Sequence, residues 1–272
     1  MPRFCANLSL LFTEVDFLDR FAAAAAAGFR AVECQFPYAW PAERIAAALA
    51  ANGLQMILHN LPPGQWGAGD RGLACIPGRE AEFRAGLETA IAYARRLGCR
   101  RLNCLAGIPP AEAPAAAVRA TLVANLRHAA ARLAREGIRL LIEPLNDRDV
   151  PGFFLRRTAE AVCLIEEVGH PNLLLQYDVY HMQVMEGNLI RTLRAHLDRI
   201  GHIQIADPPG RNEPGTGEVN FANLFRALDE AGYAGWVGCE YRPSRDTVSS
   251  LGWLRHPEGC PPAGQTPCTP GG

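Results

Sequence analysis

The amino-acid sequence predicts a single-domain α/β protein with the (β/α)8, or TIM, barrel fold. Eight short apolar runs typical of buried parallel strands alternate with eight helical patterns. They occupy about 250 residues, the usual size of such a barrel, in a chain of 272. The rival doubly wound sheet would need a GxGxxG motif after its first strand, where this chain has Ser9-Leu10-Leu11-Phe12. The barrel is therefore favoured.

Apolar runs bounded by turn residues predict the strands. In chain order they are Phe4–Leu10, Ala31–Phe36, Leu54–Asn60, Arg101–Ala106, Arg139–Asn146, Leu173–His181, His202–Asp207 and Trp236–Tyr241.

Helical periodicity and end signals predict the helices between them. Asp16 and Asn188 are residue types that favour the N-cap, and Pro41 and Pro114 suit a first helical turn. Several predicted helices are followed by a glycine, as Gly98 follows Leu97. The predicted helices are Asp16–Ala27, Pro41–Ala51, Arg79–Leu97, Pro114–Arg135, Thr158–Val168, Asn188–Arg199, Phe221–Glu230 and Asp246–Leu254.

The barrel is predicted over residues 1–256. Residues 257–272 hold five Pro and four Gly and are predicted to be a disordered tail. Three connections, 61–78, 147–157 and 208–220, are longer than usual for α/β units. Each follows a strand, which places it on the C-terminal face where barrels carry their active sites.

Composition excludes several classes of partner. With 27 basic and 28 acidic residues the net charge is -1, which gives no case for nucleic acid or an anionic membrane. No apolar stretch approaches the roughly 20 residues that span a bilayer, and the N-terminus lacks a signal-peptide pattern. Nine cysteines without a CxxC pair indicate structural thiols. The chain is predicted to be cytoplasmic.

In four predicted strands in the second half of the chain, the apolar run leads to an oxygen-bearing side chain near the end of the strand: Glu143, Asp178, Gln204 and Glu240. Buried carboxylates are costly unless they share a cation or a proton. These strands are neighbours in a barrel, about 4.8 Å apart, so inward-pointing side chains meet at its mouth. Three carboxylates and an amide oxygen suit a divalent metal such as Mg²⁺ or Mn²⁺.

Such a site suits proton abstraction beside a carbonyl, since a metal stabilises the enediolate that forms. One carboxylate removes a proton from one carbon and another returns it to the next. Glu143 and Glu240 are the predicted pair, because they are the longest acids and two other strands separate theirs. Asp178 and Gln204 are predicted to act as ligands only.

The chain resembles the hydroxypyruvate isomerase branch of the xylose-isomerase-like barrel family over Arg3–Leu254. The motifs that carry the resemblance are RFCANLSLLF, LHNLPPGQW, GDRGLACIPGREAEFR, LLIEPLN, QYDVYHMQ, HIQIAD, EPGTGE and GCEY. It implies interconversion of hydroxypyruvate and tartronate semialdehyde (2-hydroxy-3-oxopropanoate), a reaction of glyoxylate and carbohydrate metabolism. It implies the same four metal ligands and the same acid/base pair. Related epimerases carry His where Gln204 stands, which leaves the metal and the need for it open. The family often forms dimers, so a homodimer is also open.

Five further residues are candidates for binding a small hydroxy-keto acid. His181 and His59 can bond a substrate oxygen, and the alternative for each is a satisfied loop or strand histidine. Arg211 suits the substrate carboxylate, both by guanidinium chemistry and by resemblance to the epimerases, with Arg71 as the alternative. Trp66 can cover the site or simply pack in its loop.

Other activities stay open or are disfavoured. Isomerisation of a four-carbon 2-oxo-tetronate and 3-epimerisation of a ketose would share the metal site, because loop residues near Trp66 and Arg211 set substrate length. A DNA-repair nuclease of this barrel family would need several metals and a basic groove, which seven His and the net charge of -1 argue against. A non-catalytic binder would not need the second carboxylate.

Overall fold

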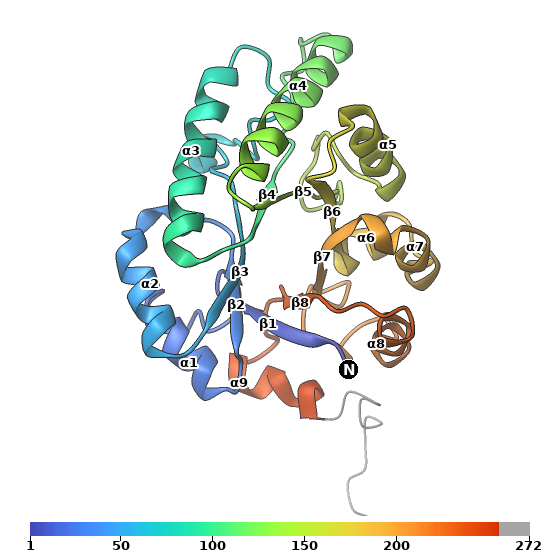
Figure 1. Cartoon of the computed structure of the whole chain (residues 1–272). Helices are drawn as coiled ribbons and strands as arrows, with labels where there is room; N and C mark the ends of the chain where they lie inside the picture. Colours follow the sequence, from blue (N-terminus) through green and yellow to red (C-terminus); the bar gives the residue numbers. More distant parts are fainter. Residues whose placement is uncertain (256–272) are drawn as a thin grey trace, which may run out of the picture.

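Eight parallel strands form a closed barrel in the order β1 to β8, and Figure 1 shows the helices as an outer ring around it. This computed structural model describes residues 1–255, and the predicted tail lies outside the described residues. The strands are β1 Arg3–Asn7, β2 Ala31–Cys34, β3 Gln55–Asn60, β4 Arg101–Cys104, β5 Arg139–Ile142, β6 Leu173–Asp178, β7 Ile200–Ile205 and β8 Trp236–Cys239. The predicted barrel is confirmed.

The helices of the described residues match most of the predicted ones. They are α1 Arg20–Ala26, α2 Ala42–Ala51, α3 Glu80–Leu97, α4 Ala115–Ala134, α5 Thr158–Val168, α6 Val179–Met185, α7 Leu189–His196, α8 Phe221–Glu230 and α9 Thr247–Ser250. Short 3-10 helices are η1 Pro37–Ala39, η2 Trp66–Ala68, η3 Leu197–Arg199 and η4 Leu251–Arg255. The first helix begins at Arg20 rather than at the predicted Asp16, because turns occupy the segment between them.

Apolar side chains fill two places. The main core contains residues of the helices and of the strands, such as Leu87 of α3 and Leu140 of β5. A smaller cluster includes Cys5, Ala31 and Leu141. Because strand side chains alternate, this cluster shares its strand faces with Asn7, Glu33 and Glu143, each two residues further on. The barrel interior therefore has an apolar layer below and a polar layer toward its C-terminal mouth.

The sixth strand ends earlier than predicted, and a helix that the sequence analysis missed follows at once. Strand β6 stops at Asp178, and α6 begins at Val179. The carboxylate of Asp178 caps this helix by accepting a hydrogen bond from the backbone N–H of Tyr180 at 2.8 Å, a role that Asp fills well. His181 consequently lies on a helix rather than in a strand.

A register shift in β3 changes which of its side chains face inward. Val32 pairs with Met56, whereas Cys34 pairs with His59, so β3 has one residue more than β2 between these pairs. An extra residue of this kind turns the following side chains to the opposite face. His59 then contacts Tyr38, and Asn60 lines the cavity described below. This parity change could not be read from the alternation of the sequence.

The long connection 61–78 is held close to the end of β4. A side chain at Gly72 would overlap the backbone carbonyl of Leu105, and the φ of Gly72 is +115°, which favours glycine. This close approach brings Trp66 and Arg71 to the C-terminal mouth of the barrel.

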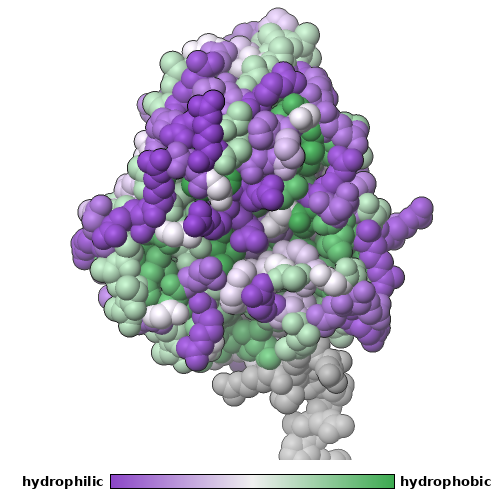
Figure 2. All heavy atoms as spheres, viewed as in Figure 1, coloured by the Kyte–Doolittle hydropathy of each residue, from purple (hydrophilic) through white to green (hydrophobic). Residues whose placement is uncertain are grey.

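Figure 2 shows hydrophilic and hydrophobic residues mixed across this face of the molecule. Among residues 1–255, no helix is both long and apolar enough to cross a membrane.

Candidate active site

A cavity of about 440 Å³ opens at the C-terminal ends of the strands. Six of the predicted site residues line it, and three do not. The lining six are Trp66, Arg71, Glu143, His181, Arg211 and Glu240. All three long connections contribute to the cavity, as their position after strands predicts.

Glu143 lies directly after β5 and is 4% exposed. Its Oε2 accepts a hydrogen bond of 2.7 Å from Nδ2 of Asn103, which lies on the neighbouring strand β4. Burial, together with the negative charges of Glu240 and Asp178, raises the pKa of Glu143 well above its ordinary value. This carboxylate is therefore a good proton carrier.

Glu240 lies directly after β8 and accepts three side-chain hydrogen bonds. Its Oε1 accepts from Asn7 and Gln35, both at 3.0 Å, and its Oε2 accepts from Nη2 of Arg211 at 2.7 Å. Burial raises its pKa, and the nearby charge of Glu33 adds to this effect, although Arg211 opposes it. Glu240 is thus held firmly in position.

Asp178 does not line the cavity and has no exposed surface. Its Oδ2 makes no hydrogen bond, although His181 Nε2 lies 3.5 Å away and Arg211 Nη2 lies 3.6 Å away. Burial raises its pKa to about 7 despite the opposing charge of Arg211. An orphaned buried carboxylate oxygen is costly, so this atom is suited to a cation.

Gln204 is the predicted ligand that the structure separates most clearly from the cavity. It is 1% exposed and does not line the cavity. Its Nε2 donates to Glu33 at 2.7 Å, and its Oε1 accepts from Gln176 Nε2 at 2.6 Å. Its register partner on β6 is nevertheless Asp178. An amide oxygen has a second lone pair, which leaves Gln204 as a fourth candidate ligand.

His181 is oriented by hydrogen bonding to the loop after β5. Its Nδ1 accepts from the backbone N–H of Asn146 at 3.1 Å. Burial and the charge of Arg211 lower its pKa well below the ordinary value, so the ring is neutral. The proton then resides on Nε2, which makes His181 a hydrogen-bond donor in the site.

Arg211 is the central cation of the site. Besides Glu240, it lies 3.8 Å from Asp149, and its guanidinium is 4.9 Å from the ring centre of Tyr180. Its own backbone is left-handed, with φ of 56°, a strained conformation often found at functional sites. The Nε atom is buried and has no hydrogen-bond partner. Arg211 therefore keeps a free donor.

Trp66 and Arg71 contact each other where they line the cavity. The guanidinium carbon of Arg71 lies 4.0 Å from the ring centre of Trp66, and its Nη1 donates to the Trp66 carbonyl at 3.1 Å. Such stacking is a favourable cation–π contact. Trp66 is 46% exposed and also contacts Phe36.

His59 does not reach the cavity. It has no exposed surface, and its Nδ1 lies 3.2 Å from the hydroxyl of Tyr38. Burial lowers its pKa to about 4. This placement argues against the predicted substrate contact and follows from the register shift in β3.

Several lining residues were missed by the sequence analysis: Gln35, Asn60, Asp149, Tyr180 and Arg242. Two of them stand at or next to the ends of β2 and β3. The rule that polar residues at strand ends build barrel sites could have found these two, had it been applied to the first half of the chain.

The donor set fits a hard divalent cation. Glu143 and Asp178, with His181, offer ligand atoms within 4.8 Å of one another, and the repulsion between the carboxylates is relieved by a positive charge. Oxygen donors of this kind suit Mg²⁺ or Mn²⁺. The hydrogen bond to Asn146 makes His181 a donor, so the carboxylates are the ligands that the structure favours.

Removing the charge of Glu143 is expected to stabilise the protein without bound metal, and to do so most at higher pH. The folded-state pKa of Asp178, about 7, and that of Glu143, which is also raised, exceed unfolded values of about 4. The folded state therefore binds more protons between these values, and stability falls as pH rises through this window. Glu143→Gln should raise Tm in EDTA more at about pH 8 than at about pH 5. Each kcal/mol gained in the free energy of unfolding corresponds to a rise in Tm of roughly 2–4 °C. A Tm difference that is independent of pH would contradict this expectation.

The closed parallel barrel, with carboxylates gathered at its C-terminal mouth, defines the class of the protein as a TIM-barrel enzyme. The chain belongs to the xylose isomerase-like TIM barrel family, whose model matches residues 21–256.

Particular relatives share most of the chain. It is 55% identical to hydroxypyruvate isomerase of Escherichia coli K12 over 93% of this chain and 98% of the relative. It is 51% identical to 2-oxo-tetronate isomerase of Cupriavidus necator, over 94% and 98% of the two chains. The crystal structure of an AP endonuclease, family 2, from Brucella melitensis is similar with a TM-score of 0.92 and 47% identity, over 94% and 98%.

Proposed function

We propose that this protein is an isomerase that interconverts hydroxypyruvate and tartronate semialdehyde by proton transfer through an enediol. The observation that carries the proposal is that two buried carboxylates, Glu143 and Glu240, line one cavity beside the guanidinium of Arg211. The similarity to hydroxypyruvate isomerase supports this substrate.

The reaction needs one carboxylate that is ionised and one that is protonated. The first takes the proton from C3 of hydroxypyruvate, and the second delivers a proton to C2, while the hydroxyl proton moves from O3 to O2. No oxidant or reductant is consumed, because one C–H bond breaks and another forms. Burial raises the pKa of both Glu143 and Glu240, and the negative charge of Glu240 adds to the effect on Glu143. Both effects favour the state in which only one of them is charged.

Other residues orient the substrate. Arg211 retains a free Nε donor and would bind the substrate carboxylate. His181, with its proton on Nε2, would donate to a substrate oxygen. Arg71 and Trp66 at the rim would limit access of water.

Glu143, Asp178 and Glu240 would hold Mg²⁺ or Mn²⁺, with Gln204 as the fourth ligand. When bound, this ion supplies Lewis acidity toward the substrate oxygens. The orphaned Oδ2 of Asp178 supports the assignment.

Isomerisation of a four-carbon 2-oxo-tetronate is the second candidate. The cavity of about 440 Å³ falls within the range of roughly 300–1,000 Å³ that holds drug-sized ligands, and it is therefore roomy for a three-carbon acid. The Cupriavidus relative bears that second name.

Kinetics on both acids test the proposal. The purified protein should convert hydroxypyruvate, and incubation in D2O should place deuterium on the substrate carbon. A kcat/KM that strongly favours the four-carbon acid would replace the first assignment by the second. Absence of exchange with either acid would refute both. The homodimer and the cytoplasmic location stay predictions.

A further inference from the structure

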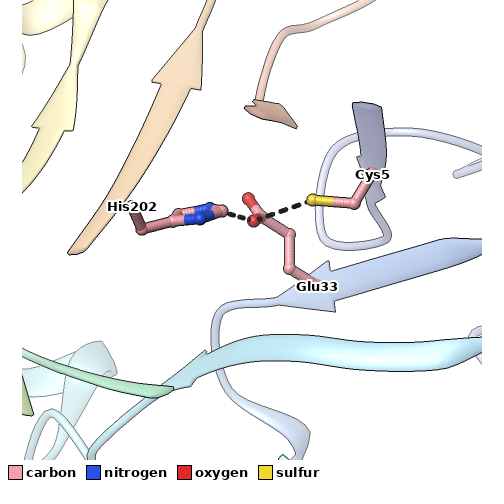
Figure 3. Close-up of side chains that lie close together, drawn as sticks. All are labelled: Cys5, Glu33 and His202. Carbon is pink, nitrogen blue, oxygen red and sulfur yellow. Dashed lines mark hydrogen bonds and ion pairs between the residues drawn. The ribbon is translucent and has the colours of Figure 1, made fainter. Parts of the chain in front are cut away.

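A further carboxylate lies inside the barrel and does not line the cavity. Glu33 of β2 has no exposed surface. Figure 3 shows the thiol of Cys5 and the imidazole of His202 approaching its carboxylate from opposite sides. The substrate chemistry proposed above does not use it.

Four donors surround this carboxylate. Oε2 accepts from His202 Nε2 at 2.6 Å and from the Cys5 thiol at 3.5 Å. Oε1 accepts from Gln204 Nε2 at 2.7 Å and from Asn7 Nδ2 at 2.9 Å. Cys, Glu and His could together ligate a metal, but a cation here would have to displace these bonds. Glu33 and its four donors instead form one hydrogen-bonded group, here called the hub: Cys5, Asn7, Glu33, His202 and Gln204.

Strand β8 leaves room for this hub directly below Glu240. A side chain at Gly238 would place its Cβ 2.5 Å from Oε2 of Glu33. Gly238 precedes Glu240 by two residues and so shares its strand face. The carboxylate of Glu33 fills the space that a side chain at this position would take.

Asn7 connects the two carboxylates. Its Nδ2 donates to Glu33 Oε1 at 2.9 Å and to Glu240 Oε1 at 3.0 Å, and its Oδ1 accepts from the backbone N–H of Ser9 at 3.0 Å. Ionised carboxylates only accept hydrogen bonds. Glu33 therefore holds the Nδ2 side of the Asn7 amide, as the Ser9 N–H holds its Oδ1 side, and Asn7 in turn holds Glu240 Oε1.

We propose that Glu33 is a positioning residue that, acting through Asn7, holds Glu240 in the orientation needed for proton transfer. This inference rests on the proposed function. It assigns no contact between Glu33 and the substrate.

Glu33→Gln is the first test. One amide oxygen cannot accept from His202, Gln204 and Asn7 as two carboxylate oxygens do, so the hold of residue 33 on Asn7 Nδ2 should weaken. We expect kcat to fall roughly 10–100-fold, the usual effect of losing an outer hydrogen-bond partner, with KM changed less than about 3-fold. Cys5→Ala removes only the longest contact of the hub and should leave kcat unchanged. If Glu33→Gln does not fold, Glu33→Asp keeps the charge but withdraws it by about one C–C bond, roughly 1.5 Å, and should show the same loss of kcat.

A double-mutant cycle separates positioning from general damage. Asn7→Ala should lower kcat, and adding the Glu33 substitution to it should lower kcat little further. Fully multiplicative losses would overturn the proposal. So would a crystal structure of the Glu33 variant in which Glu240 is undisplaced while kcat has fallen. A wild-type protein that turns over neither acid would refute the proposed function, yet the position of Glu240 in that crystal structure would still test the role of Glu33.

Discussion

Replacing Glu143 by Gln is expected to lower kcat by about 10²–10⁴-fold, the usual contribution of a general acid or base. Gln keeps the length of the side chain and can still accept the hydrogen bond from Asn103, which is 2.7 Å long in the wild type. It cannot take up a proton from carbon. Deuterium incorporation into the substrate in D2O, followed by NMR, should therefore stop together with turnover.

The matched control makes the same chemical change away from the barrel mouth. Glu43 lies in α2 on the outer ring, with its side chain 72% exposed, and Glu43→Gln should leave kcat unchanged. Full deuterium exchange by a folded Glu143→Gln protein would remove Glu143 from the acid/base pair. Exchange without net isomerisation would show instead that Glu143 takes no part in removing the first proton.

Removal of divalent ions is expected to lower kcat/KM by roughly 10³-fold. A divalent ion contributes several kcal/mol of charge stabilisation in such reactions, and each 1.4 kcal/mol is about tenfold in rate. Without it, the repulsion among Glu143, Asp178 and Glu240 is opposed by the charge of Arg211. The measurement is activity after exhaustive chelation, with elemental analysis of the protein.

Recovery identifies the ion and its ligands. Adding Mg²⁺ or Mn²⁺ to the chelated protein should restore activity, and Asp178→Asn should raise the Mn²⁺ concentration that is needed. Circular dichroism of the chelated protein controls for loss of fold. Undiminished activity in protein that contains far less than one metal ion per chain would contradict the metal assignment.

The barrel and its acidic mouth could be predicted because burial and alternation leave a clear trace in the sequence. The apolar runs that end at Glu143 and Glu240 needed only the rule that parallel strands end on one face. The pairing of Glu240 with Arg211 could not be predicted, since it depends on the conformation of a long loop.

The end of β6 and the register of β3 each depend on a single residue, and hydrophobic periodicity does not reveal such a residue. The apolar run of β6 continues into α6, and only the capping bond of Asp178 marks the boundary. The extra residue in β3, which reverses the faces on which His59 and Asn60 lie, has no marker such as glycine or proline.

The role of Glu33 could not be predicted, because a lone acid inside a strand has no partner nearby in the sequence. Its partners come from β1 and β7.

The hydrogen bonds around the carboxylates join the two halves of the polypeptide. Glu143 and Glu240 belong to the half that begins at β5, whereas the amides that bond them, from Asn103, Asn7 and Gln35, all belong to the half that ends at β4. A chimera that combines β1–β4 of one homologue with β5–β8 of another would keep every acid and still assemble a poorly aligned centre unless these three amides matched. Exchange of half-barrels between members of the family is thus constrained by side chains that carry no charge.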